Sequence, residues 1–166
     1  MRRSAGSCSR TTSPSSTSPS SNIAIAASPE TVFELVSDPT AFPRWAPGFA
    51  RSARPAGQHW IIENEQGEAR IVVRSSREHG TVDILSADDP SQGAYSRVLP
   101  NGDGSEYQFT LQFPLDAPDD AVTAQMAVVE AELEAVRALC SSGVGGALPV
   151  AAAEDGEGED ACAADQ

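Results

Sequence analysis

Lysine is absent from this 166-residue sequence, and all 11 basic residues are arginine. A chain without lysine has no side-chain amine for Schiff-base chemistry and cannot supply the phosphate-binding lysine of a P-loop. These two kinds of site are therefore excluded.

Cysteine and histidine are scarce as well. The three cysteines are Cys8, Cys140 and Cys162, and the two histidines are His59 and His79. Their spacing matches no metal-binding motif and no disulfide framework, and neither histidine has a nearby partner that would suggest a catalytic triad. We therefore expect free thiols, no metal site and no cofactor.

Long apolar runs are also missing. No segment approaches the ~18 apolar residues of a membrane-spanning helix. Arg2-Arg3 and the Ala5–Cys8 segment lack the apolar run that follows in an export or lipoprotein signal. We therefore expect a cytoplasmic protein with no stable membrane insertion.

Negative charge dominates, with a formal net charge of −13. Residues 22–142 hold 8 of the 11 arginines and 18 of the 24 acidic residues. Such a surface repels phosphate backbones, so nucleic acid is not an expected partner.

Three regions differ in composition. Residues 1–21 are rich in Ser, Thr and Pro, and residues 143–166 are rich in Gly, Ala and acids. Neither composition buries enough apolar surface to offset the entropy of ordering. We expect both ends to be disordered tails around one domain at residues 22–142, which is long enough to form a core without disulfides.

The domain opens with an alternating strand pattern over Asn22–Ala27, followed by a capped helix. Ser28 suits the N-cap, Pro29 the first helical position and Glu30 the positive end of the helix dipole. Asp38-Pro39 ends this helix, and Phe42-Pro43-Arg44-Trp45 predicts a second, short helix.

Alternating runs separated by turn residues then predict six further strands. Their close spacing without helical crossovers favours an antiparallel meander. The expected strands are Phe49–Arg54, Gln58–Asn64, Ala69–Arg77, Thr81–Ser86, Ala94–Leu99 and Tyr107–Phe113.

One long amphipathic helix of about 20 residues is predicted after Pro118. Its apolar residues recur at spacings of three and four, and Glu130, Glu132, Glu134 and Arg137 are assigned to its solvent face. The apolar seam consists of Val122, Met126, Val129, Leu133, Val136 and Cys140.

The Ser28–Trp45 segment and the Arg97–Leu111 segment resemble small bacterial members of the START-related superfamily, which includes polyketide cyclases, aromatases and lipid-transfer proteins. The resemblance covers nearly all of residues 22–142. It implies an α+β helix-grip fold, in which a seven-stranded curved antiparallel sheet wraps around the long C-terminal helix and two short helices follow the first strand.

Such a fold leaves a cavity between the sheet, the terminal helix and the short helices, and this cavity is the expected site. Tyr107, Phe109 and Leu111 alternate with polar residues, so their face is expected to point inward. Each candidate has the alternative role of a core side chain that touches no ligand. The predicted ligand-binding residues are Trp45, Trp60, Tyr95, Arg97, Tyr107, Phe109, Leu111, Met126 and Val129.

Asp83 and Arg97 are the candidate catalytic residues. If their hairpin is centred near Pro90, the two stand opposite one another, either inside the cavity or as an exposed cross-strand pair. The register of the next hairpin decides the side. A four-residue Asn101–Gly104 loop puts Arg97 beside Gln108, away from the aromatic face, whereas slippage by one residue puts it beside Phe109.

The leading hypothesis is the binding, transport or sequestration of a small hydrophobic or aromatic molecule in this cavity. The first alternative is an enzyme of the polyketide cyclase or aromatase type. The second is a co-chaperone or stress-response interaction module. The sequence does not indicate the ligand's identity or the oligomeric state.

Overall fold

A computed structural model describes residues 16–90 and 92–142. In chain order the elements are β1 (Ser16–Thr17), β2 (Ser20–Ile25), α1 (Pro29–Ser37), the 3-10 helix η1 (Pro39–Ala41), α2 (Phe42–Trp45), β3 (Ser52–Ala56), β4 (His59–Asn64), β5 (Gly67–Ser76), β6 (Thr81–Ser86), β7 (Gly93–Asn101), β8 (Gly104–Leu111), β9 (Phe113–Pro114) and α3 (Asp119–Ser142).

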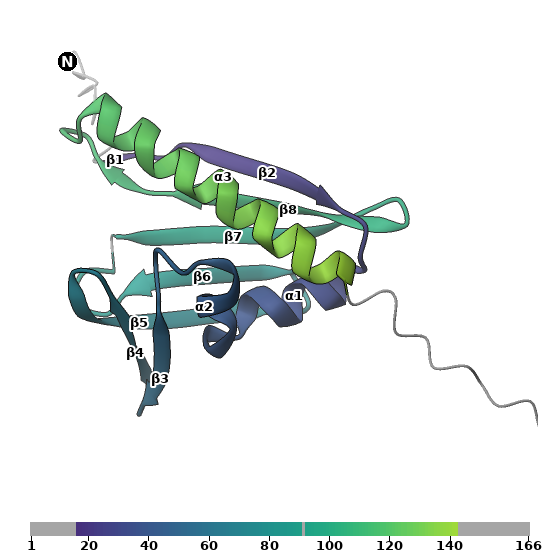
Figure 1. Cartoon of the computed structure of the whole chain (residues 1–166), viewed down its shortest axis with the longest axis horizontal. Coiled ribbons are helices and arrows are strands. Elements are labelled where there is room, and N and C mark those ends of the chain that lie inside the picture. Colours follow the sequence, from purple (N-terminus) through teal and green to yellow (C-terminus); the bar gives the residue numbers. More distant parts are fainter. Residues whose placement is uncertain (1–15, 91, 143–166) are drawn as a thin grey trace, which may run out of the picture.

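The main sheet has seven antiparallel strands in the order β2-β8-β7-β6-β5-β4-β3. Figure 1 shows α3 lying obliquely across one face, with α1 and α2 over the same face. The β3–β4 hairpin runs across the direction of the other strands, so the sheet is strongly curved (Figure 1). The predicted α+β helix-grip arrangement, with seven strands, two short helices and a long C-terminal helix, is confirmed.

The caps predicted for the first helices are present. The Ser28 side chain accepts a hydrogen bond from the N–H of Thr31 at 3.3 Å, and Pro29 begins α1. Backbone hydrogen bonding and the Ser28 side chain hold the pKa of Glu30 below its usual value. Asp38 Oδ1 accepts from the N–H of Thr40 at 2.9 Å and starts η1. These local contacts fix the direction in which the chain reaches α2.

The core lies between α3 and the sheet. The predicted seam is buried from Val129 onward, whereas Val122 and Met126, nearer the start of α3, are only partly buried. Tyr107 and Phe109 point inward from β8 as predicted, at 1% and 7% exposure. The buried seam residues are Val129, Leu133, Val136 and Cys140.

Some predicted boundaries were wrong. Residues 16–21 were expected in the first tail, but Ser16–Thr17 form β1, which pairs with β9, and Ser20 begins β2, which pairs with β8. Phe49 was expected in a strand. It lies instead in a turn after α2, where its N–H bonds the carbonyl of Ala46 at 3.0 Å and its ring packs on Phe42. The tail predictions for residues 1–15 and 143–166 lie outside the described residues.

Candidate functional site

A cavity of about 250 Å³ lies between the helix-covered face of the sheet and α3. Strands β4 to β8 form its floor, and α2, the turn after it and α3 form its other walls. Its larger side chains are mostly apolar, as in ligand pockets generally. They include Trp45, Phe49, Ile62, Ile71, Phe109 and Leu111.

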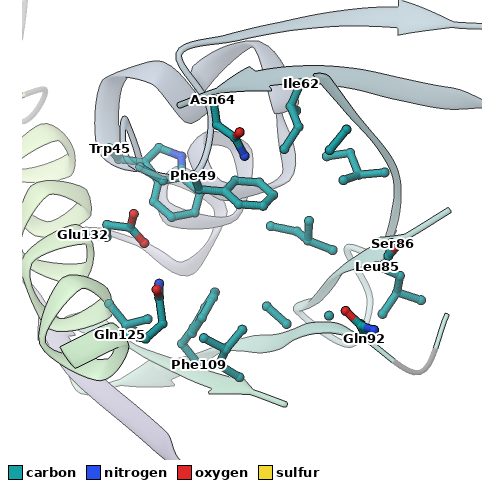
Figure 2. A pocket seen from close by; sticks show the side chains of 18 of the residues that line it. Trp45, Phe49, Ile62, Asn64, Leu85, Ser86, Gln92, Phe109, Gln125 and Glu132 are labelled. Atoms are coloured by element: carbon teal, nitrogen blue, oxygen red, sulfur yellow. The ribbon is translucent and has the colours of Figure 1, made fainter. Parts of the chain in front are cut away.

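Polar side chains interrupt this apolar lining. In Figure 2, Glu132 and Gln125 project from α3 near Trp45 and Phe109, whereas Ser86 and Gln92 lie at the opposite end. Such isolated polar groups in an apolar wall fix the orientation of a bound molecule. The polar lining residues are Asn64, Arg70, Ser86, Gln92, Gln125 and Glu132.

Trp45 is the last residue of α2 and is only 2% exposed. Its ring packs edge-on against Phe42, with the ring centroids 5.5 Å apart. The indole Nε1–H has no hydrogen-bond acceptor among the residues that the structure describes. A buried donor without a partner costs free energy, because its lost hydration is not replaced by another hydrogen bond.

Glu132 was assigned to the solvent face of its helix, and that assignment was wrong. It comes three residues after Val129 and four before Val136, so it shares an edge with the buried seam and lines the cavity. Burial raises the pKa of the Glu132 carboxyl from 4.5 to about 7. The spacing of Glu132 from Val129 and Val136 indicates the buried side of the helix. Glu132 was placed on the solvent face because its side chain is charged.

Tyr107 is buried beneath α3 next to Ser96. Burial raises the pKa of its hydroxyl well above the usual value; hydrogen bonding with Ser96 opposes this rise, and the charge of Glu132 adds to it. Ser96 in turn donates to the carbonyl oxygen of Val82 at 2.7 Å. Tyr107 is therefore an uncharged core residue, held by a polar contact inside the sheet layer.

The structure brings together only some of the predicted ligand-binding residues. Those that line the cavity are Trp45, Phe109, Leu111 and Val129. Those that lie outside its lining are Trp60, Tyr95, Arg97, Tyr107 and Met126.

Strand alternation and distance along the helix explain the second group. Ala94, Ser96 and Val98 are the buried residues of this part of β7, so Tyr95 and Arg97, which alternate with them, point to the other face. Trp60 packs at the edge of the core, and Met126 lies on the less buried half of α3.

The expected pairing of Asp83 with Arg97 was wrong. The β6–β7 hairpin is centred on Asp89 instead of Pro90, so Asp83 stands opposite Tyr95 and Arg97 stands opposite Thr81. One residue in the centre of a hairpin shifts the pairing by two positions.

Both candidates have other partners. The Asp83 carboxylate lies 3.8 Å from Arg74 Nη2, and Arg97 Nε donates to the carbonyl oxygen of His79 at 3.3 Å. Arg97 does stand beside Gln108, as the Asn101–Gly104 loop predicted. Both side chains are therefore away from the cavity.

Neither a metal cluster nor a membrane helix occurs in the described part of the chain. Within residues 16–90 and 92–142, no three His, Cys, Asp or Glu side chains gather closely enough to hold a metal ion. No helix in these ranges is both long and apolar enough to cross a bilayer. The cytoplasmic location stays a prediction.

These features define an α+β helix-grip-like domain with a cavity between sheet and helix. The sequence matches the family described as "Polyketide cyclase / dehydrase and lipid transport" over residues 16–140, and the chain belongs to this family. No curated protein matches the sequence significantly.

Solved structures share the fold at low sequence identity. A START superfamily protein from Mycobacterium smegmatis has 20% identity and a TM-score of 0.61, over 75% of this chain and 97% of that chain. The protein XoxI from Bacillus cereus has 15% identity and a TM-score of 0.63, over 75% and 95%. The Aha1 dimer from Colwellia psychrerythraea has 14% identity and a TM-score of 0.57, over 73% and 96%.

Proposed function

We propose that this protein binds a small hydrophobic or aromatic molecule in the cavity between its sheet and α3. The observation that carries this proposal is the cavity itself: about 250 Å³, lined by the rings of Trp45, Phe49 and Phe109. Apolar surface transferred from water into such a space contributes about 25 cal/mol per Å². The family description, which includes lipid transport, supports the same function.

Ala94 offers a direct test because it lines the cavity from β7 and is buried. We expect Ala94→Leu to fill part of the space and to weaken binding of the neutral fluorescent probe N-phenyl-1-naphthylamine by about tenfold or more, equivalent to 1.4 kcal/mol. Probe fluorescence during titration measures the affinity. The control is Ala138→Leu, the same change at an exposed position of α3.

Equal affinities for the two variants and the wild type would place the probe elsewhere and overturn the proposal. Circular dichroism checks that both variants keep the wild-type fold, since overpacking a site is itself destabilising.

An enzyme of the cyclase or aromatase type is the second candidate. Asp83 and Arg97 no longer support it, but Glu132 does, because a carboxyl whose pKa lies near 7 inside a cavity suits proton transfer. Chemical change separates the two functions: a binding protein returns a bound molecule with its mass unaltered, as mass spectrometry of the extracted molecule would show.

A further inference from the structure

Asn64, the last residue of β4, presents a polar side chain to the cavity. The buried Ile62 faces inward from this strand, and Asn64, two positions later, lies on the same side. The Asn64 side chain is half-buried and lines the cavity, and Figure 2 shows it pointing inward near Phe49. A molecule that fills the cavity therefore contacts this amide.

The turn between β4 and β5 fixes the orientation of the amide. Asn64 Oδ1 accepts a hydrogen bond from the backbone N–H of Gln66 at 2.9 Å, which forms an Asx turn. A backbone N–H can only donate, so the amide atom that bonds it is the oxygen. The amide nitrogen, which carries two N–H groups, is the other end of the amide and lies on its cavity side in Figure 2.

This nitrogen is both free and reachable. Among residues 16–90 and 92–142, no acceptor is bonded to Asn64 Nδ2. The nitrogen also keeps accessible surface, unlike the indole nitrogen of Trp45, which the protein encloses. The Asn64 N–H groups are therefore available to a molecule in the cavity.

The other polar side chains of the lining are engaged or are not held in one orientation. At the opposite end of the cavity, Arg70 pairs with Asp88, and Gln92 donates to the Asp89 carboxylate at 2.9 Å. On α3, no hydrogen bond within the described ranges holds the longer side chain of Gln125. Asn64 differs from these groups because it combines a fixed orientation with a free donor.

A free donor in the wall discriminates between ligands. A ligand oxygen replaces water as the acceptor of the N–H, whereas an apolar group at the same place displaces the water and leaves the donor unpaired. A ligand N–H gives no compensation either, because an amide nitrogen does not accept hydrogen bonds.

We propose that Asn64 is a specificity-determining residue of the cavity, and that it selects apolar aromatic molecules that bear a carbonyl group, by donating its amide N–H to the carbonyl oxygen. This inference rests on the proposed binding function. It adds the polar chemistry of the ligand, which the apolar lining alone leaves open.

Three probes with one skeleton test the selection. Fluorenone, fluorene and carbazole have the same three fused rings and differ at one position, which bears a carbonyl oxygen, a methylene group or an N–H group. Equilibrium dialysis of the full chain gives their affinities at a single pH of about 8, because Glu132 in the same cavity has a pKa of about 7 and must keep one charge throughout.

The substitution Asn64→Asp reverses the hydrogen-bonding chemistry and keeps the turn. Aspartate also forms Asx turns, so one oxygen still accepts from Gln66 while the other presents an acceptor to the cavity. We expect the ratio of fluorenone affinity to carbazole affinity to fall by about tenfold or more, because one hydrogen bond is lost and another is gained. Fluorene reports any change in the cavity that affects all three probes.

The matched control is Gln58→Glu, which makes the same amide-to-carboxylate change at an exposed position of the β3–β4 turn. It should keep the wild-type ratio. An equal fall of the ratio in Gln58→Glu would assign the effect to net charge and overturn the selection.

A second readout uses the wild type alone. In ¹H–¹⁵N spectra the side-chain amide signals of Asn64 should move downfield with fluorenone and much less with fluorene, whose aromatic rings have the same shape. Their loss in Asn64→Asp identifies these signals. The side-chain amides of Asn22 and Asn101, which both bond Glu106, serve as internal references.

The outcomes separate the two proposals. An unchanged affinity ratio in folded Asn64→Asp, or equal Asn64 shifts with fluorenone and fluorene, would overturn the selection and leave the binding function standing. If circular dichroism shows that Asn64→Asp does not fold, the wild-type shifts decide the question. If none of the three probes binds the wild type, the proposed function itself fails, and this inference fails with it.

Discussion

Glu132 stands at the margin between the buried and exposed sides of α3, and its environment makes folding stability depend on pH. The carboxyl has a pKa of about 7 in the folded protein, against an ordinary value of 4.5. Between these values the folded state holds a proton that the unfolded chain has released, so stability falls as pH rises through this window. The loss is fully present above about pH 7 and absent below about pH 4.5.

Replacing this carboxyl should therefore stabilise the protein at alkaline pH. We expect Glu132→Gln to raise the free energy of unfolding by about 1–2 kcal/mol at about pH 8, after allowance for the partial exposure of the side chain, and by far less at about pH 4.5. Urea denaturation at both pH values measures the difference. Glu130→Gln should change stability by no more than a few tenths of a kcal/mol at either pH. A pH dependence of Glu132→Gln as steep as that of the wild type would contradict the assignment.

Single residues also mark what the sequence could and could not predict about the site. Trp45, Phe109, Leu111 and Val129 were expected near a ligand, and they line the cavity because aromatic and apolar periodicity reports which side is buried. Glu132 was not predicted because helical spacing places it at the edge of the seam. At this edge, burial depends on which residues of the sheet and of the turn after α2 lie opposite. Those partners are distant in sequence.

At the scale of elements, the turn at Gly80 joins β5 and β6 and also contacts β7. Gly80 has φ = +64°, and its carbonyl oxygen accepts from the N–H of Val98 at 2.8 Å. A Cβ at this position would meet the carbonyl oxygen of Val98 far inside van der Waals contact. Gly57, in the β3–β4 turn, has φ = +67° with nothing within 4 Å of an added Cβ.

Alanine substitutions at Gly57 and Gly80 separate the cost of backbone strain from the cost of a steric clash. We expect Gly57→Ala to cost about 1 kcal/mol, because an L residue is strained at positive φ. Gly80→Ala should cost about 2 kcal/mol more, since β7 must move as well. Thermal or urea unfolding of the two variants measures both costs, and equal losses would show that the β7 contact is of no consequence.

Elements were predicted best where local chemistry defines them. The bounds Thr81–Ser86 were predicted to the residue, and the caps of α1 follow from Ser28 and Pro29. The β1–β9 pair was missed, because each partner has only two residues and the ladder joins segments far apart in the chain. The Asp83 register failed for a related reason: alternation assigns a face, but only the length of the turn sets the partner.

At the scale of the whole molecule, Cys140 connects the end of α3 to the common core. It is 3% exposed, and burial raises the pKa of its thiol. Thiolate is the reactive form of cysteine. The folded protein should therefore slow the reaction of Cys140 in two ways: reagents cannot reach the buried sulfur, and less of the thiol is ionised.

A variant that combines Cys8→Ser with Cys162→Ser leaves Cys140 as the sole thiol of the chain. We expect its reaction with Ellman's reagent to be slow in buffer and to reach a rate independent of reagent concentration, set by opening of the core. The urea-unfolded variant should react at once. A rate in buffer that matches the unfolded rate would contradict the burial of α3.

The order of the sheet has a consequence for how the molecule assembles. Strands β3 to β8 each pair with a strand next to them in the sequence. The edge strand β2 instead pairs with β8, which lies near the other end of the domain sequence: Ser20 stands opposite Thr110, 90 positions later. Joining them requires closure of a loop that contains most of the domain, and such non-local pairing is slow. During synthesis β2 leaves the ribosome long before β8 exists, so this edge of the sheet cannot form until the chain has been made as far as β8.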